Sequence, residues 1–502
     1  MRPGTAVLLL LAQQAADTLG IGVQPSGTTA SFLRTHLACT EDEVLRWARP
    51  TYADPGIDPD RAVGICESLQ SRLSLSEAEL RKMVLLRPQV LRCDFESSVA
   101  PSLAALQSRL SLSEPELKKV VLKLPPLLGR SFQSTIAPSL ATLQSRLSLT
   151  EPELKRVVMK VPAVLGLSYR SNIEPSLAAL QSRLSLSDAE LKKVVLALPP
   201  VLGLSYEANI EPTLAALQSR LLLSEPELKK VVMRLPAVLG CSFEANIEPK
   251  LAKLQYRLSL SEPELKKVVL SLPSVLGYSF ASNIAPSLAA LQSRLSLSEP
   301  ELKKAVLSFP AVLGCSFEAN IAPTLEALQS RLSLSEPELK KVVVRLPQVL
   351  GCSFETNIEP SLAALQLRLS LSEPELKQVV LRLPAVLGCS FEANIEPKLD
   401  FFESAFRLAP DELRERVLAN PTQLGYSLEL RYRPRVALAS ALGVAVTREM
   451  LRSAGKYTDA QFMALLRRRE QVGLADVDWA ALCRLPLEER AGAAGRVRHA
   501  QC

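Results

Sequence analysis

PSLAALQLRLSLSEPELKQVVLRLPAVLGCSFEANIEP, residues 360 to 397, opens and closes on a proline that marks a repeat. This proline recurs every 37 residues, at positions 101, 138, 175, 212, 249, 286, 323, 360 and 397, so eight near-copies in register occupy residues 101–396. A second proline keeps the same interval from position 88 to position 421. A period of about 20 to 50 residues is typical of solenoids, propellers and arrays. The repeat therefore decides the fold.

The first part of each copy predicts a short helix. Pro138 suits a first helical turn, where its missing N–H costs nothing. Leu140, Leu143 and Leu147 follow at spacings of three and four, which places them on one side of a helix. The first helix of this copy therefore has one apolar stripe.

The second part predicts another helix. Ser113 and Glu116 form an S-x-x-E capping box, and an apolar face follows, made by Leu117, Val120, Val121 and Leu124. We expect this helix to run from Glu116 to about Leu124, with Pro125 ending it and Gly129 supplying a stop. The remainder, such as SFEANIE at 390–396, is too short for a full helix and predicts a turn or a 3₁₀ segment.

Neither helix can bury its stripe alone, so neighbouring copies must stack. Sustained alternation of apolar and polar residues is absent from the sequence, and proline interrupts each candidate strand. We therefore predict an all-α fold, an α-solenoid of tandem 37-residue helix-turn-helix repeats. The expected organisation is a targeting or disordered segment at 1–35, the repeat array at 36–434 with divergent copies at both ends, and a helical C-terminal cap and tail at 435–502.

Residues 1–35 differ in composition from the array. Arg2 precedes the apolar run from Ala6 to Ala12, and Asp17 is the only acidic residue before position 36. Seven apolar residues are too few to span a bilayer, but they suit the core of a cleavable signal or an organelle presequence. Targeting is favoured over a frayed first helix. No transmembrane segment is predicted elsewhere.

Composition limits the possible chemistry. The net charge of +7 is modest for 502 residues and does not by itself indicate a polyanionic partner. Nine cysteines include no C-x-x-C pair, and a repeat position that holds cysteine in four copies holds leucine in others, so reduced thiols in a reducing interior compartment are expected. His36 and His499 are the only histidines. We predict no catalytic site, no metal site and no cofactor.

The segment VVLRLPAVLG at 379–388, preceded by SEPEL and followed by SFEANIEP, resembles the repeat of the mitochondrial transcription termination factor (mTERF) family. Residues 424–435, LGYSLELRYRPR, resemble the close of that family's final repeat. The resemblance covers residues 40 to 465. It implies a superhelix of helix pairs that binds organelle DNA or RNA, including double-stranded DNA, in a mitochondrion or chloroplast. Such a protein would be a monomer acting in transcription termination, transcription regulation or RNA processing, with organelle gene-expression proteins as further partners.

A basic doublet on the second helix recurs through the array, from Lys118 and Lys119 to Lys340 and Lys341. Its second residue lies opposite the core face, and stacking would align it into a stripe that can hold phosphates. A position two residues before the second proline varies between copies, which fits contacts that differ from one repeat to another and fits drift at an unconstrained surface equally well. The predicted nucleic-acid-binding residues are Lys119, Lys123, Arg156, Lys160, Lys193, Lys230, Arg234, Lys267, Lys304, Lys341, Arg345 and Arg382, with Arg433 and Arg435 at the C-terminal end.

Alternatives remain for each of these rows. From the residues alone a solvated face is favoured for the lysine stripe over binding, and the resemblance reverses that preference. A recurrent arginine, Arg72 to Arg368 at the same interval, is expected to pair with neighbouring glutamates rather than to flank a groove. A recurrent aromatic residue, Phe95 to Phe391, is expected to fill the core. The alternative function is a protein-interaction solenoid that holds a partner helix or tail.

Overall fold

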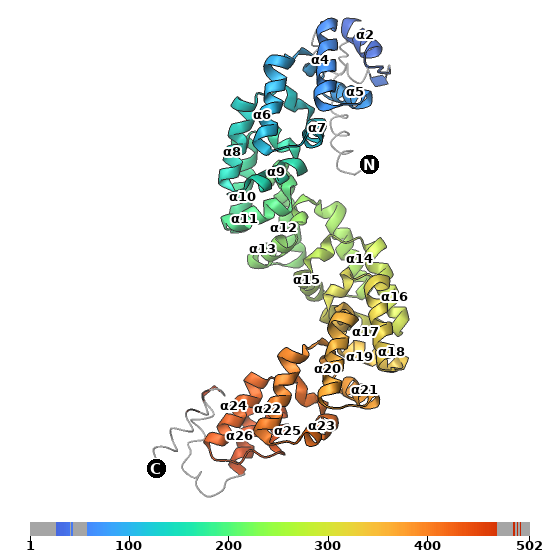
Figure 1. Ribbon diagram of the computed structural model, residues 1–502, viewed down its shortest axis with the longest axis vertical. Helices are drawn as coiled ribbons and strands as arrows, with labels where there is room; N and C mark the ends of the chain where they lie inside the picture. The colour runs from blue at the N-terminus through green and yellow to red at the C-terminus, as the bar shows by residue number, and fades with distance from the viewer. Residues whose placement is uncertain are drawn as a thin grey trace. The chain divides into compact units, whose positions relative to one another are not determined.

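The computed structural model describes residues 27–40, 42–43, 58–468, 485–486, 489 and 492. Contacts divide the chain into two compact units, Met1–Glu248 and Pro249–Cys502. Helices and short helical turns make up the regular structure of the described residues, which contain no strand (Figure 1). The prediction of an all-α solenoid is confirmed.

The first helices of the repeats begin one residue before the repeating proline in the regular copies, so that the proline lies in the first turn as predicted. They are α4 (Pro59–Leu73), α6 (Ala100–Leu110), α8 (Ala137–Arg146), α10 (Glu174–Arg183), α12 (Glu211–Leu221), α14 (Glu248–Leu258), α16 (Ala285–Leu295), α18 (Ala322–Arg331), α20 (Glu359–Arg368) and α22 (Glu396–Phe406).

The second helices start two residues earlier than expected, because the serine of the capping box is the N-cap itself. In α7 the Ser113 side chain accepts from the Glu116 N–H, and the Glu116 carboxylate accepts from the Ser113 N–H at 2.8 Å. The second helices are α5 (Glu77–Leu86), α7 (Glu114–Lys123), α9 (Glu151–Lys160), α11 (Asp188–Ala197), α13 (Glu225–Arg234), α15 (Glu262–Ser271), α17 (Glu299–Ser308), α19 (Glu336–Arg345), α21 (Glu373–Arg382) and α23 (Pro410–Ala419).

A 3₁₀ segment follows each second helix and occupies the proline-to-glycine stretch. These segments are η1 (Pro88–Arg92), η3 (Pro125–Gly129), η5 (Pro162–Gly166), η7 (Pro199–Gly203), η9 (Pro236–Gly240), η11 (Pro273–Leu276), η13 (Pro310–Gly314), η15 (Pro347–Gly351), η17 (Pro384–Gly388) and η19 (Pro421–Gly425).

A single π turn then leads directly into the next first helix. These turns are η2 (Phe95–Val99), η4 (Phe132–Ile136), η6 (Tyr169–Ile173), η8 (Tyr206–Ile210), η10 (Phe243–Ile247), η12 (Phe280–Ile284), η14 (Phe317–Ile321), η16 (Phe354–Ile358), η18 (Phe391–Ile395) and η20 (Leu428–Tyr432).

For SFEANIE the sequence predicts a turn or a 3₁₀ segment, and the structure has a single π turn there, η18. In η18 the N–H of Glu396 donates to the carbonyl of Phe391, five residues back. Pro397 has no N–H for the carbonyl of Ala393, and its ring would clash with that carbonyl in a regular α-helix. We attribute the wider turn to this proline.

The left-handed residue of each repeat is also not where glycine was expected. Gly129 has no positive φ, whereas Ser111, between the first and second helices, has φ 47°. Leu112 N–H donates to the Gln107 carbonyl at 2.9 Å and Ser111 N–H to that of Ser108 at 3.2 Å, which is a Schellman-type cap. The same conformation recurs at Ser74, Ser148, Ser185, Leu222, Ser259, Ser296, Ser333, Ser370 and Arg407.

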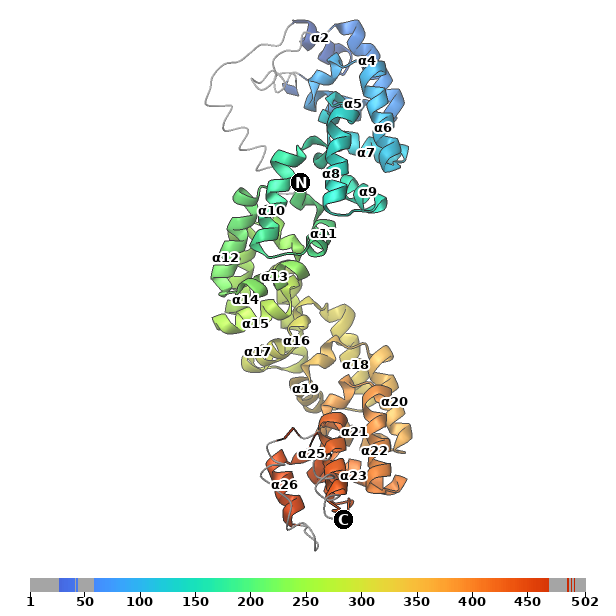
Figure 2. The same ribbon diagram turned by 90° about the vertical axis from the view of Figure 1, so that its left-hand side faces the viewer.

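Stacking buries the apolar stripes between layers. Within a unit, second helices pack on the second helices of the next repeat, as α7 does on α9 and α17 on α19, and the 3₁₀ segments pack on one another in the same way. First helices pack against the second helix of the next repeat, as α6 does on α9 (Figures 1 and 2). Leu117, Val120 and Val121 on α7 are fully buried, as the apolar spacing predicted.

The ends of the array carry additional helices. Helix α2 (Gly27–Thr35) packs on α4, and its Phe32 and Leu33 are buried. The predicted segment 1–35 therefore includes a helix that packs with the array, and the targeting prediction for residues 1–26 lies outside the described residues. After the last π turn come α24 (Arg433–Ala441), α25 (Met450–Lys456) and α26 (Asp459–Arg468). Of the described helices, none has the length and apolar character needed to cross a membrane.

Candidate nucleic-acid interface

The first lysine of each basic doublet is used between repeats. Lys155 Nζ on α9 lies 2.7 Å from Glu116 Oε2 on α7 and donates to the Ser111 carbonyl at 2.8 Å. Glu116 is the capping-box carboxylate of the preceding repeat, so one side chain caps its own helix and binds the next. Six further lysines pair in this way with the preceding repeat at 2.7–2.8 Å, namely Lys118, Lys192, Lys229, Lys303, Lys340 and Lys377.

A second set of ion pairs joins the first helices to the next repeat. Arg257 Nη1 lies 2.7 Å from Glu299 Oε2, and its Nη2 donates to Gln292 Oε1 at 2.5 Å. Gln292 Nε2 in turn donates to Glu299 Oε1 at 2.9 Å, which closes a triangle of three side chains. Equivalent triangles form around Arg72, Arg109, Arg146, Arg183, Arg294 and Arg331. The expectation that this arginine pairs with glutamate is confirmed, and these cations are not available to a ligand.

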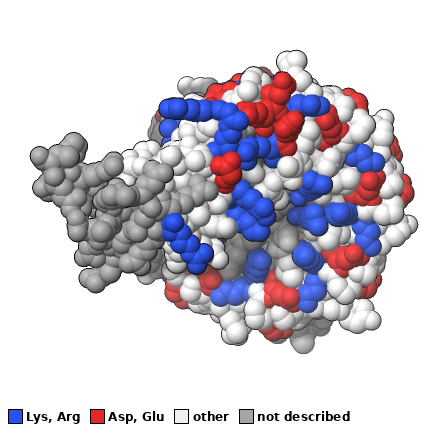
Figure 3. Space-filling model, turned by 90° about the horizontal axis from the view of Figure 1, so that it is seen from below, with Lys and Arg blue, Asp and Glu red and all other residues white. Residues whose placement is uncertain are grey.

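The second residue of each doublet is exposed and has no hydrogen bond or ion pair within the part of the chain that the structure describes. We call these residues the cation row: Lys82, Lys119, Arg156, Lys193 and Lys230 in the first unit, and Lys267, Lys304 and Lys341 in the second. Because they occupy one position on second helices that pack side by side within each unit, their charges lie in a row over that layer. Figure 3 shows one face of the molecule, on which Lys and Arg side chains gather near the middle and Asp and Glu lie mainly nearer the edge.

Lys82 was missed by the sequence prediction. It lies on α5, 37 residues before Lys119, so the repeat interval is the signal that could have found it. The row ends towards the C-terminus of the array, where the same position holds Gln378 and then Glu415. This position is therefore basic from α5 to α13 in the first unit and from α15 to α19 in the second, and it is uncharged on α21.

The second predicted position is also exposed, but its residues differ in what they contact. Lys123, Lys160 and Arg234 have no partner among the described residues. Arg345 donates to the Leu381 carbonyl at 3.3 Å, and Arg382 donates to the Leu418 carbonyl at 3.0 Å. These two arginines thus bind the carboxyl end of the next second helix, where the helix dipole favours a cation.

The two C-terminal arginines are separated by the structure. Arg433 is exposed, lies 2.9 Å from Glu429 and stacks over the Phe401 ring. Arg435 is only 1% exposed, and it binds the Ala454 carbonyl at 2.8 Å and Asp459 at 2.7 Å. The prediction that Arg435 contacts nucleic acid is wrong, because its guanidinium holds α25 and α26 against α24.

The recurrent aromatic residue packs rather than presenting a ring. Tyr169, Phe243 and Phe391 are buried, and the Tyr206 hydroxyl donates to Glu211 at 2.5 Å. Burial raises the pKa of both Tyr169 and Tyr206, with the carboxylate partner as a further cause. The other rings of the series are half-buried, so none of them is fully presented to solvent.

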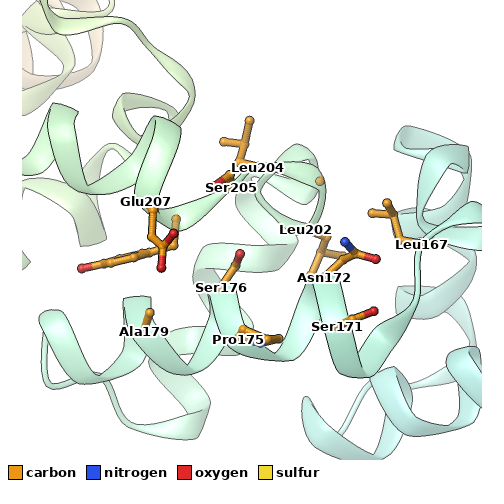
Figure 4. A pocket seen from close by; sticks show the side chains of 12 residues that line it. Leu167, Ser171, Asn172, Pro175, Ser176, Ala179, Leu202, Leu204, Ser205 and Glu207 are labelled. Atoms are coloured by element: carbon orange, nitrogen blue, oxygen red, sulfur yellow. The ribbon is translucent and has the colours of Figure 1, made fainter.

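Small pockets recur on another side of the repeat. The pocket in Figure 4 has a volume of about 380 Å³ and is lined by two consecutive repeats, with Ser171 and Asn172 from one and Ser176, Leu204 and Ser205 from the next. Equivalent positions line the pockets at residues 204–244 and 351–392. None of the predicted cations lines them.

The described residues offer little else for chemistry. They include no cluster of three or more His, Cys, Asp or Glu side chains that could hold a metal ion. Seven described cysteines are free thiols, as expected, and burial raises the pKa of Cys66 to about 11. A thiol of this kind is unreactive at neutral pH.

Comparison with protein families gives one match. The family model mTERF matches residues 68–319 and 290–462, which together span most of the chain. No curated protein sequence matches this chain. The matched region includes each repeat from α5 to α23 and the C-terminal arginine motif. The chain therefore belongs to the mTERF family.

Proposed function

We propose that this protein binds nucleic acid by backbone contacts along the cation row and thereby regulates gene expression in an organelle. Membership of the mTERF family supports the general role. The observation that supports this interface is that the two basic residues of each doublet differ in their contacts. Lys155 forms an ion pair with Glu116, whereas Arg156, the next residue, is exposed and has no partner among the described residues.

Phosphate groups are the ligand that such a row suits. Its cations project from equivalent positions of stacked helices, and each phosphate that one of them neutralises releases condensed counterions. The nearby carboxylates do not cancel them. Glu114 is bound by Arg72 and Gln107, and Glu116 by Lys155. The same contacts recur along the array, so the row keeps its charge.

The finer parts of the proposal extend what membership of the family supports. Regulation of transcription, including its termination, or processing of RNA in a mitochondrion or chloroplast is the expected role, with organelle DNA or RNA as the ligand and the chain acting as a monomer. Organelle gene-expression proteins are the expected further partners. Expressing the whole chain fused to a fluorescent protein tests the location, and a diffuse cytosolic signal would count against it.

A second candidate is a protein-interaction scaffold, which the recurring pockets favour. They are lined by Asn, Ser, Leu, Pro and Glu residues, such as Asn172 and Ser205, and the volume of about 380 Å³ in Figure 4 can take a side chain of a bound peptide. Binding there would leave the cation row unused.

One experiment separates the two candidates. The triple variant Lys119→Gln, Lys193→Gln and Lys230→Gln is compared with Lys253→Gln, which removes an exposed lysine without a described partner from first helix α14. Fluorescence anisotropy with labelled duplex DNA and with single-stranded RNA reports the affinity. We expect the triple variant to bind at least one of these ligands much more weakly than wild type and the control to bind as wild type does. An unchanged affinity in the triple variant refutes the cation row as the interface.

A further inference from the structure

The position four residues after the cation row varies along an otherwise uniform array. It holds Lys123, Lys160, Ala197, Arg234, Ser271, Ser308, Arg345 and Arg382, and all of them are exposed. Residues i and i+4 lie on the same side of a helix, one turn apart. Each second helix therefore presents a pair of side chains to the same solvent region, of which the first is nearly constant and the second is not.

At this position, the cations that have no hydrogen bond among the described residues lie in the first unit. Lys123, Lys160 and Arg234 have no described partner, whereas Arg345 and Arg382 donate to backbone carbonyls of the next repeat. The remaining repeats carry the uncharged Ala197, Ser271 and Ser308. The array thus has repeats with two available cations and repeats with one.

The strongest concentration lies on α7 and α9, which pack against each other. These neighbouring helices carry four available cations: Lys119, Lys123, Arg156 and Lys160. The corresponding pair in the second unit, α15 and α17, carries only Lys267 and Lys304, with serine at both second positions.

The carboxylates of α7 and α9 leave these four cations free. Glu114 and Glu116 are at the first turn of α7, about two turns from Lys123, and are bound by Arg72 and by Lys155. On α9, Glu151 is bound by Arg109, and Glu153 by Lys192 at 2.8 Å. All four carboxylates of this pair of helices are therefore engaged in contacts between repeats.

We propose that α7 and α9 form the principal phosphate clamp of the protein, and that the residue four positions after the cation row sets how strongly each repeat holds the backbone. The inference rests on the proposed function, and its ligand is the phosphodiester backbone of a nucleic acid. Repeats with alanine or serine at the second position hold the backbone through one cation and contribute less.

The test is the double variant Lys123→Ser and Lys160→Ser, which gives these repeats the side chain that α15 and α17 already have. Both lysines are exposed and without described partners, so the fold is retained. For duplex DNA, the slope of log K against log salt should fall in magnitude by about 1.8, and affinity at moderate salt by roughly tenfold or more. Single-stranded RNA should show a smaller change in slope, about 1.4, for the same two contacts.

Two further variants separate the effect of the cations on α7 and α9 from the effect of the net charge of the protein. Lys253→Ser with Lys456→Ser removes the same charge from exposed positions on α14 and α25 and should leave the slope unchanged. Ser271→Lys with Ser308→Lys should steepen it by about 1.8 for duplex DNA. A control that loses as much affinity as the clamp variant overturns the inference, as does a clamp variant that keeps the wild-type slope. A wild type that binds neither ligand overturns the proposed function itself.

Discussion

Lys155 Nζ lies 2.7 Å from Glu116 Oε2, and the two residues belong to different repeats, 39 positions apart. This contact explains why a run of two basic residues per repeat does not yield two rows of available charge. The first cation holds the array together, and the second, Arg156 in this repeat, is left at the surface. Of two adjacent residues, Lys155 thus stabilises the solenoid through its contact with Glu116, and Arg156 is the residue proposed to bind nucleic acid.

Acid should weaken the contacts between repeats. The hydrogen bond from Lys340 is the largest cause that lowers the pKa of Glu301 from the ordinary 4.5 to about 2, and the Ser298 N–H adds to it. A carboxyl whose pKa is depressed in the folded state stabilises that state above its unfolded pKa, and the contribution is lost as the pH falls through the folded pKa. We expect stability to fall between about pH 4.5 and pH 2. Urea denaturation monitored by circular dichroism measures the free energy of unfolding at each pH in this range.

The matched variant for that experiment is Glu301→Gln. It lacks the titrating group, so its stability should depend less on pH over the same interval, while its stability at neutral pH should be lower than that of wild type. Equal pH dependence in the two proteins would show that the ion pair of Glu301 and Lys340 contributes nothing.

Loss of one arginine triangle should destabilise the second unit. Arg257→Met removes the contacts to Glu299 and Gln292, and a partly exposed network of this kind is worth about 1 kcal/mol. Lys253→Met on the same helix is the control, since Lys253 is exposed and has no described partner. A shift of the urea midpoint in Arg257→Met alone confirms the role, and equal midpoints in both variants contradict it.

The left-handed serine between the helices should be improved by glycine. Ser296 has φ 47°, where an L-residue costs roughly 1–2 kcal/mol and glycine does not. After the greater chain entropy of unfolded glycine is subtracted, Ser296→Gly should stabilise the protein by about 0.5 kcal/mol. The bond from Lys340 to the Ser296 carbonyl is retained because it involves the backbone.

Ala289→Gly, at an exposed position in the interior of α16, is the control and should destabilise the protein. Glycine in a helix interior is destabilising by roughly 0.5–1 kcal/mol relative to alanine. Thermal denaturation of both variants compares them directly, and a lower melting temperature in Ser296→Gly would contradict the assignment of backbone strain to this turn.

Arg435 should matter for the C-terminal cap and not for binding. Arg435→Met leaves the Ala454 carbonyl without its buried partner, which costs roughly 1–3 kcal/mol. Amide hydrogen exchange over α25 and α26 should therefore accelerate, while binding of nucleic acid by the remaining array is retained. Arg433→Met, at an exposed position two residues earlier, should leave exchange in those helices unchanged. Slow exchange in Arg435→Met would refute the anchoring role.

Much of the repeat could be predicted from the sequence because its signals are local. The proline of the first turn, the capping box of Ser113 and Glu116 and the buried face of Leu117 and Val121 each depend on residues within one helix. The interval of 37 residues then required neighbouring copies to stack. These features were sufficient for the solenoid.

What could not be predicted depends on contacts between repeats or on backbone conformation. Lys118 and Lys119 look alike in sequence, and only stacking brings the first of them to Glu79, at 2.7 Å. The burial of Arg435 depends on how α25 and α26 fold back on α24. The left-handed conformation of Ser111 has no glycine to indicate it.

The most direct test of the account is the salt dependence of binding by the whole chain. If the cation row and the clamp on α7 and α9 hold phosphates, log K for duplex DNA should fall with log salt with a slope of about −4 or steeper, since each contact contributes about −0.9. The Lys119→Gln, Lys193→Gln and Lys230→Gln variant should reduce the magnitude of that slope by about 2.7. A slope near zero in the wild type, or a slope that the triple variant leaves unchanged, would contradict the assignment of this surface to nucleic acid.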